Sequence, residues 1–134
     1  GQLGDGAAVV SKDERYLPVF WPQSGEYANT TYFLTDPSFE KHVEFARWDE
    51  MVSEFAIMTD GLQRLALDYS TKLGHRGFFH PLFRDLRASV ASDQLDGPLA
   101  EFLDCPRVNQ RTDDDKTLIL ATRLSPCAPI NHPL

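Results

Sequence analysis

The hydrophobic pattern of this sequence changes once, at Asp60-Gly61, and that change limits the folds open to the chain. Before it, apolar residues alternate with polar ones or form short runs, which is typical of β-strands. After it, apolar residues recur three and four positions apart, as on one helix face, at Leu62, Leu65, Ala66 and Tyr69. Strands followed by helices, with one more strand near the end, predict an α+β fold.

The pattern predicts antiparallel strands at about 7–10, 16–21, 30–35, 42–48, 54–59 and 117–122. The first two form a hairpin around the charged segment 11–15. Between the last two strands we expect helices at about 62–71, 81–91 and 97–104, the last with Asp96 as its N-cap. Residues 125–134, rich in proline, predict a loose C-terminal tail after a domain that spans 1–124.

Composition excludes several classes of function. The chain has 134 residues, with 13 Lys and Arg against 20 Asp and Glu, and a net charge of −7. That surplus would repel nucleic acid, because neutralising phosphates supplies most of non-specific affinity. The apolar runs are far shorter than the roughly 20 residues that cross a bilayer. With 2 cysteines and no secretory signal pattern, the sequence predicts a cytoplasmic location.

Carboxylates stand next to the expected strands. Asp5 comes just before a strand, Asp60 just after one, and residues 113–115 just before another. Neighbouring antiparallel strands bring such positions to one edge of the sheet. Two carboxylates about 4 Å apart repel by roughly 4 kcal/mol at an effective dielectric near 20, so a hard cation such as Mg²⁺ or Mn²⁺ could compensate. Solvated turns and an acidic loop that aids solubility are the alternative.

Three segments resemble the motifs of type 2C, metal-dependent protein phosphatases, the PPM family. In residues 55–62 an apolar strand ends in Thr-Asp-Gly, and residues 112–121 are similar to the family's closing motif, an Asp followed by Thr and a hydrophobic strand. Residues 4–10 resemble its Gly-Asp-Ser-Arg strand. Residues 21–31 are similar to the bacterial branch, and the whole resemblance covers 4–123.

The resemblance implies site residues position by position. Asp60 matches the ligand of the first catalytic metal, and Asp114 matches the ligand in the closing motif. Asp113 and Asp115 are alternates within the same run, but only Asp114 places Thr117 three residues later, as the motif requires.

Asp5 matches a position that, in some members, helps to hold a third and looser metal together with the Asp60 equivalent. Gly6 and Ala7 stand where the family usually has Ser-Arg.

The implied function is hydrolysis of phosphoserine and phosphothreonine in proteins by a water that bridges two Mn²⁺ or Mg²⁺ ions, without a covalent enzyme intermediate. A phosphoprotein is the implied partner, and a cognate serine/threonine kinase is a further candidate. The family's bridging ligands lie on strands earlier than any in this sequence. We therefore expect the chain to be the C-terminal half of the phosphatase β-sandwich, inactive alone and able to dimerise through exposed strands.

Two other interpretations stay open at this point. A non-catalytic member of the same fold would act as a protein-binding or regulatory module, and its upstream sequence would lack a strand ending in Asp-Gly. A self-contained small domain, with acidic loops that only aid solubility, would be a monomer that does not respond to metal.

Overall fold

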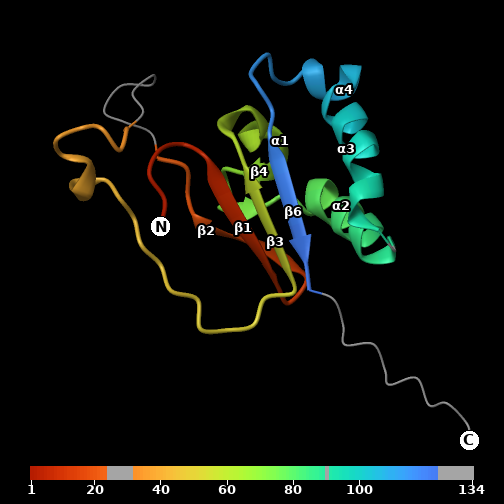
Figure 1. Cartoon of the computed structure of the whole chain (residues 1–134), viewed down its shortest axis with the longest axis horizontal. Helices are drawn as coiled ribbons and strands as arrows, with labels where there is room; N and C mark the ends of the chain where they lie inside the picture. Colours follow the sequence, from red (N-terminus) through yellow and green to blue (C-terminus); the bar gives the residue numbers. More distant parts are fainter. Residues whose placement is uncertain (24–31, 90, 124–134) are drawn as a thin grey trace, which may run out of the picture.

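The computed structural model describes residues 1–23, 32–89 and 91–123. Within these ranges, one antiparallel sheet has the strand order β4-β5-β2-β1-β3-β6 (Figure 1). The strands are β1 (Ala7–Lys12), β2 (Arg15–Phe20), β3 (Glu54–Met58), β4 (Leu67–Asp68), β5 (Leu73–Gly74) and β6 (Leu118–Thr122). The helices are α1 (Gln63–Ala66), α2 (Arg76–Ala88), α3 (Asp96–Leu103) and α4 (Pro106–Asn109). The predicted α+β class is confirmed.

The central strands bring three chain segments together at one end of the sheet. β1 forms the predicted hairpin with β2, turning through Asp13 and Glu14, whose φ angles are 50° and 59°. On its other side β1 pairs with β3, with Ala7 opposite Met58. β3 in turn pairs with β6, with Met58 opposite Leu118. The start of β1, the end of β3 and the start of β6 are therefore neighbours.

The core lies between the sheet and α2, which crosses one face of the sheet (Figure 1). Phe79 and Phe83 of α2 are fully buried, and their rings lie 5.1 and 5.8 Å from the ring of Tyr16 on β2. Burying a phenylalanine contributes about 2 kcal/mol. At the end of α2, Arg87 forms an ion pair with Glu54, the first residue of β3, whose side chain is 4% exposed. Helix and sheet are thus joined by apolar packing and by one ion pair whose carboxylate is buried and whose arginine is half exposed.

Two predicted strands are wrong. Of 30–35, the first two residues lie outside the described ranges. The others form no strand and lead into a turn, where Phe33 N–H donates to Asp36 Oδ2 at 2.9 Å. The segment 42–48 contributes only an isolated bridge between Gln2 and Glu44. Its alternation misled because the apolar side chains are not on a buried face: Phe45 is 82% exposed.

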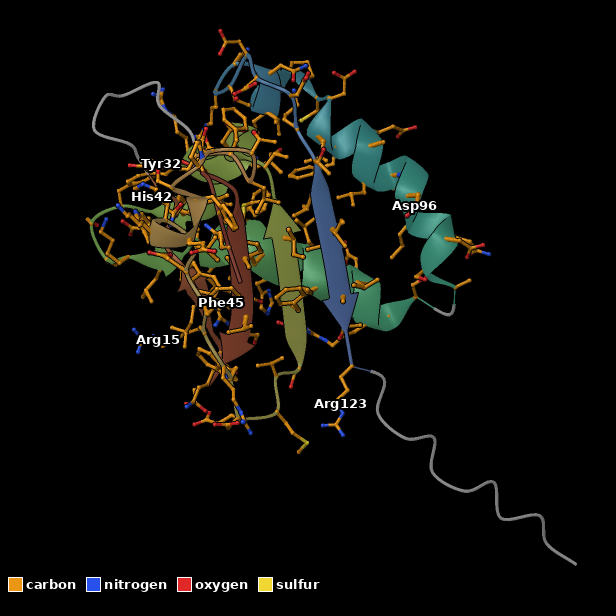
Figure 2. All side chains as sticks on the ribbon, turned by 60° about the vertical axis from the view of Figure 1, so that its left-hand side comes forward. Arg15, Tyr32, His42, Phe45, Asp96 and Arg123 are labelled. Atoms are coloured by element: carbon orange, nitrogen blue, oxygen red, sulfur yellow. The ribbon has the colours of Figure 1, made fainter. Side chains whose placement is uncertain are left out.

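The described part of the connection between β2 and β3, residues 21–23 and 32–53, is instead irregular apart from the 3-10 turn η1 (Phe39–Lys41). Tyr32 stacks on His42 with ring centroids 3.6 Å apart, and the two side chains lie together in Figure 2. Gln23 Nε2 donates to the His42 carbonyl at 2.7 Å. Ring stacking and polar contacts hold this segment where strand pairing was expected.

The helix predicted at 62–71 is also wrong in most of its length. A 3-10 turn, η2 (Asp60–Leu62), leads into one turn of α1, after which the chain forms the β4-β5 hairpin. The Asp68 carboxylate accepts hydrogen bonds from Ser70 N and Oγ at 2.8 and 2.6 Å, which fixes the turn. These bonds lower the pKa of Asp68 to about 2. A side chain that competes for local backbone N–H groups ended the helix early.

The helix predicted at 81–91 begins five residues earlier, at Arg76, and contains Pro81 in its interior. Its first turn is supported by the His75 carbonyl, which accepts from the N–H groups of Phe78 and Phe79. The predicted helix 97–104 agrees with α3, but Leu95 occupies the N-cap position and Asp96 is the first helical residue. The 3-10 turn η3 (Ser92–Leu95) and α4 were not predicted.

The predicted tail, residues 125–134, lies outside the described ranges. Among the residues that the structure describes, no helix has the length and apolar character to span a membrane.

Candidate metal centre

Asp60 stands at the point where β3 ends and the helical segment begins. Thr59 is extended, with φ −78° and ψ 166°, and Asp60 opens the 3-10 turn η2. The Asp60 carboxylate accepts a hydrogen bond from Gly61 N–H at 3.0 Å. This bond orients one carboxylate oxygen and leaves the side chain exposed at the end of the sheet.

Gly61 lets the closing loop approach the Asp60 turn. A Cβ atom at Gly61 would lie 2.3 Å from the Asp115 carbonyl oxygen and 3.3 Å from the Asp114 Cβ. No side chain fits at such distances, so glycine is required here by the contact between the two segments. The Asp-Gly pair is therefore more than a turn signal, because its glycine brings Asp114 next to Asp60.

The Thr59 hydroxyl group forms hydrogen bonds that join the Asp60 turn to the closing loop. Its Oγ1 donates to the Asp115 carbonyl at 3.3 Å and accepts from Thr117 N–H at 2.9 Å. The Thr59 N–H also donates to the Thr117 carbonyl at 3.2 Å. Sequence reasoning missed this role. The hydroxyl directly before Asp-Gly marks the position, but the sequence carries no signal of its partners, which lie 56 and 58 residues away.

Asp5 reaches the site through the pairing of β1 with β3. It lies between Gly4, whose φ is 95°, and Gly6, two residues before the start of β1. Gln2 Nε2 donates to the Gly6 carbonyl at 2.8 Å, and Gly4 N–H donates to Gln23 Oε1 at 3.0 Å. Side chains from both sides therefore fix the backbone around Asp5.

Asp5 and Asp114 both act electrostatically on Asp60. Partial burial raises the pKa of Asp60 above its ordinary value of 3.8, and the negative charges of Asp5 and Asp114 raise it further. The hydrogen bond from Gly61 opposes this shift. Asp115 N–H donates to Asp114 Oδ1 at 2.8 Å, so Asp115 supports its neighbour through the backbone.

The structure brings Asp5, Asp60 and Asp114 within electrostatic reach, and of the run 113–115 only Asp114 acts on Asp60 among the causes of its shift. In the part of the chain that the structure describes, no group of three or more His, Cys, Asp or Glu side chains is arranged to hold a metal ion. The donor set suits a hard cation in charge and atom type, but it does not complete a site. The ligand assignments stay predictions.

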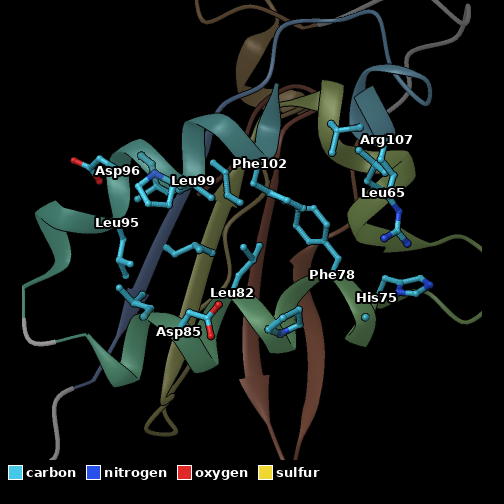
Figure 3. Close-up of a pocket in the computed structure, with 18 of the residues that line it drawn as sticks. Leu65, His75, Phe78, Leu82, Asp85, Leu95, Asp96, Leu99, Phe102 and Arg107 are labelled. Carbon is cyan, nitrogen blue, oxygen red and sulfur yellow. The ribbon is translucent and has the colours of Figure 1, made fainter. Parts of the chain in front are cut away.

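A groove among the described residues lies elsewhere. It has a volume of about 1000 Å³ and opens between α2, α3, α4 and β6, over a floor that includes Phe78, Leu82 and Leu99 (Figure 3). None of the three aspartates lines it. The groove is mainly apolar, and none of the motif carboxylates reaches it, so the candidate centre is the sheet end.

The sequence of this chain is similar to those of known proteins. Residues 1–104 match the family model for protein phosphatase 2C. The chain is 42% identical over 122 residues to Serine/threonine-protein phosphatase 3 of Escherichia coli, which is 90% of this chain and 48% of that protein.

A shorter stretch of 67 residues is 36% identical to the CRISPR system Cms endoribonuclease Csm3 of Mycobacterium tuberculosis, covering 50% of this chain and 28% of that protein. No solved structure matches. The chain thus spans about half the length of the phosphatase, or less for the second relative.

Proposed function

Because the chain belongs to the protein phosphatase 2C family, we propose that the full-length protein hydrolyses phosphoserine and phosphothreonine in protein substrates. Asp60, Asp114 and Asp5 would hold Mn²⁺ or Mg²⁺, two catalytic ions and a looser third. The bound ions supply positive charge that activates a water and stabilises the phosphoryl oxygens. The family match and the name of the bacterial relative support this proposal.

One observation carries the proposal furthest. The pairing of β1, β3 and β6 brings Asp5 and Asp114, from distant parts of the chain, to the end of the sheet where Asp60 stands. Burial raises the pKa of Asp60, and the charges of these two carboxylates raise it further. Gathering like charges is unfavourable unless a cation compensates them. Within the described residues the set falls short of a complete site, so the full-length protein would provide further ligands.

Two residues of this chain, Thr59 and Gly61, would contribute by placing the metal ligands and not by taking part in the chemistry. Thr59 fixes the closing loop through its hydroxyl, and Gly61 leaves the space that the loop needs. Asp114 is thereby held near Asp60 before any ion binds, which lowers the entropy lost on binding. A cytoplasmic location and a cognate kinase as partner belong to the same proposal.

The test is hydrolysis of a phosphothreonine peptide by the full-length protein in Mn²⁺. Asp60→Asn and Asp114→Asn should each lower kcat/KM by at least about 100-fold, because each removes a ligand of the catalytic ions. Asp113→Asn, which changes an exposed carboxylate of the same run, is the matched control and should stay near the parent.

If Asp113→Asn loses activity and Asp114→Asn does not, the metal ligand in the closing motif is Asp113, one position earlier. If the parent protein folds, binds phosphopeptide and hydrolyses none, the non-catalytic binding module is correct instead. Unchanged activity in both Asp60→Asn and Asp114→Asn would contradict the metal site.

A further inference from the structure

Gln63 connects the Asp60 turn to the backbone of Asp5. It is the first residue of α1, and its Nε2 donates to the Asp5 carbonyl at 2.5 Å. Its Oε1 accepts a hydrogen bond from the Tyr69 hydroxyl at 2.7 Å. Because Tyr69 engages the oxygen of the amide, the nitrogen of the same amide is turned toward Asp5.

The Tyr69 ring is itself fixed by its neighbours. It meets the Trp21 ring edge to face, with centroids 5.1 Å apart. The Lys72 ammonium lies 4.1 Å from the Trp21 centroid and 5.8 Å from that of Tyr69. Trp21 packs against the hydrophobic core. The hydroxyl that orients Gln63 is therefore anchored to the core although Tyr69 is 49% exposed.

We propose that Gln63 is a positioning residue that holds Asp5 beside Asp60, and that Tyr69 orients Gln63 for this task. The inference rests on the proposed metal site. Asp5 lies between two glycines, and such a backbone samples many conformations unless it is held. Gln2 and Gln23 hold the glycines on either side, and Gln63 holds the Asp5 carbonyl itself. Gln63 follows Asp60 within the same helical segment, so its hydrogen bond fixes Asp5 relative to Asp60 directly.

Residues that hydrogen-bond to a metal ligand, without touching the metal, orient that ligand and so affect the affinity of the site for the metal. The same hydrogen bonds could instead only stabilise the α1 segment. The two roles differ in one respect: a positioning role depends on the Asp5 carboxylate, and a purely structural role does not.

The test is Mn²⁺ binding to the full-length protein, measured from the electron paramagnetic resonance signal of the free ion. Gln63→Met removes both hydrogen bonds at nearly constant length. It should weaken, by about tenfold, the same class of bound Mn²⁺ that Asp5→Asn weakens. Tyr69→Phe, which removes one hydroxyl, should weaken that class by about threefold. Saturating Mn²⁺ should restore phosphopeptide hydrolysis in both Gln63→Met and Tyr69→Phe.

The double variant decides between the two roles. If Gln63 acts through Asp5, Asp5→Asn/Gln63→Met binds Mn²⁺ as Asp5→Asn alone does. Gln94→Met and Tyr32→Phe are matched controls outside this network and should bind as the parent does. Should Gln63→Met fail to fold, Tyr69→Phe in the parent and in the Asp5→Asn background replaces it.

Parental Mn²⁺ binding by Gln63→Met, or equal weakening with and without the Asp5 carboxylate, would overturn the inference and leave the proposed function intact. Parental Mn²⁺ binding by Asp60→Asn would overturn the proposed function itself, and the inference with it.

Discussion

At the end of the sheet, Asp60 is the side chain whose pKa is raised by its surroundings. Burial comes first among the causes that raise its pKa, and the charges of Asp5 and Asp114 follow. The motif residues could be predicted because each is marked by its own neighbours in sequence. Thr59 and Gln63 could not, since their partners lie 56 and 58 residues away. A hydrogen bond over such a separation has no local signal.

Replacing Asp60 by Asn should stabilise the protein at pH 7 when divalent cations are removed. A carboxyl with a raised folded-state pKa contributes stability that is full below its unfolded value, 3.8, and is lost as pH rises through the folded value. The gain should be below about 1 kcal/mol, since the side chain is exposed and screened. Urea unfolding at pH 7 and pH 3 measures it, and the difference should vanish at pH 3.

A less stable Asp60→Asn variant at pH 7 in the absence of metal would contradict this electrostatic account. Asp113→Asn provides the control, because it removes an exposed charge that is not among the causes of the raised pKa of Asp60.

Replacing Thr59 by Val should lower stability by about 1 to 2 kcal/mol, because the hydroxyl bonds to Asp115 and Thr117 are lost at nearly constant volume. Thr59→Ser keeps the hydroxyl and should remain close to the parent. Thr122→Val is a matched control on the same sheet, where the hydroxyl bond is long, at 3.4 Å. Thermal unfolding compares the three variants. Equal midpoints for Thr59→Val and Thr122→Val would count against a stabilising role for the Thr59 hydroxyl.

At the scale of elements, the predictions succeeded where pairing is local or burial is strong. The β1-β2 hairpin, β3, β6 and α3 were recognised from short runs and caps. The segments 30–35 and 42–48 failed because alternation shows which residues could share a face, not whether a partner strand exists. The region 62–71 failed because the Asp68 turn outweighed a helical period only two turns long.

The ion pair between the buried Glu54 and the half-exposed Arg87 joins β3 to α2, and breaking it should lower the stability of the fold. Arg87→Met leaves a carboxylate that is 4% exposed without its cation, so we expect a loss of about 3 kcal/mol. Arg84→Met is the control, because the pair of Arg84 with Asp85 is exposed on both sides and should contribute under about 0.5 kcal/mol. Chemical denaturation measures both, and similar losses would show that the pair of Glu54 with Arg87 has no special role.

For the molecule as a whole, the sheet presents an apolar face away from the helices. Ile57 and Ile119 are directly opposite each other on β3 and β6, and they are 43% and 59% exposed. β6 is also the last strand of the sheet as described, so its outer edge is unpaired there. Such a face and edge favour association with another β surface.

The chain on its own should therefore self-associate. Ile57→Lys/Ile119→Lys should shift it toward the monomer, because two charges on adjacent strands oppose burial of that face. Ser92→Lys/Gln94→Lys adds the same charge at exposed positions in η3 and serves as the control. Light scattering after size-exclusion chromatography reports the mass, and a monomeric parent chain at high concentration would contradict the prediction.

Anomalous scattering from crystals of the full-length protein soaked in Mn²⁺ tests the central claim most directly. The account predicts peaks within about 2.1 Å of carboxylate oxygens of Asp60 and Asp114, and a weaker peak near Asp5. The peaks at Asp60 and Asp114 should be lost in crystals of Asp60→Asn. Well-ordered crystals with Mn²⁺ bound elsewhere, and none at Asp60 or Asp114, would contradict it.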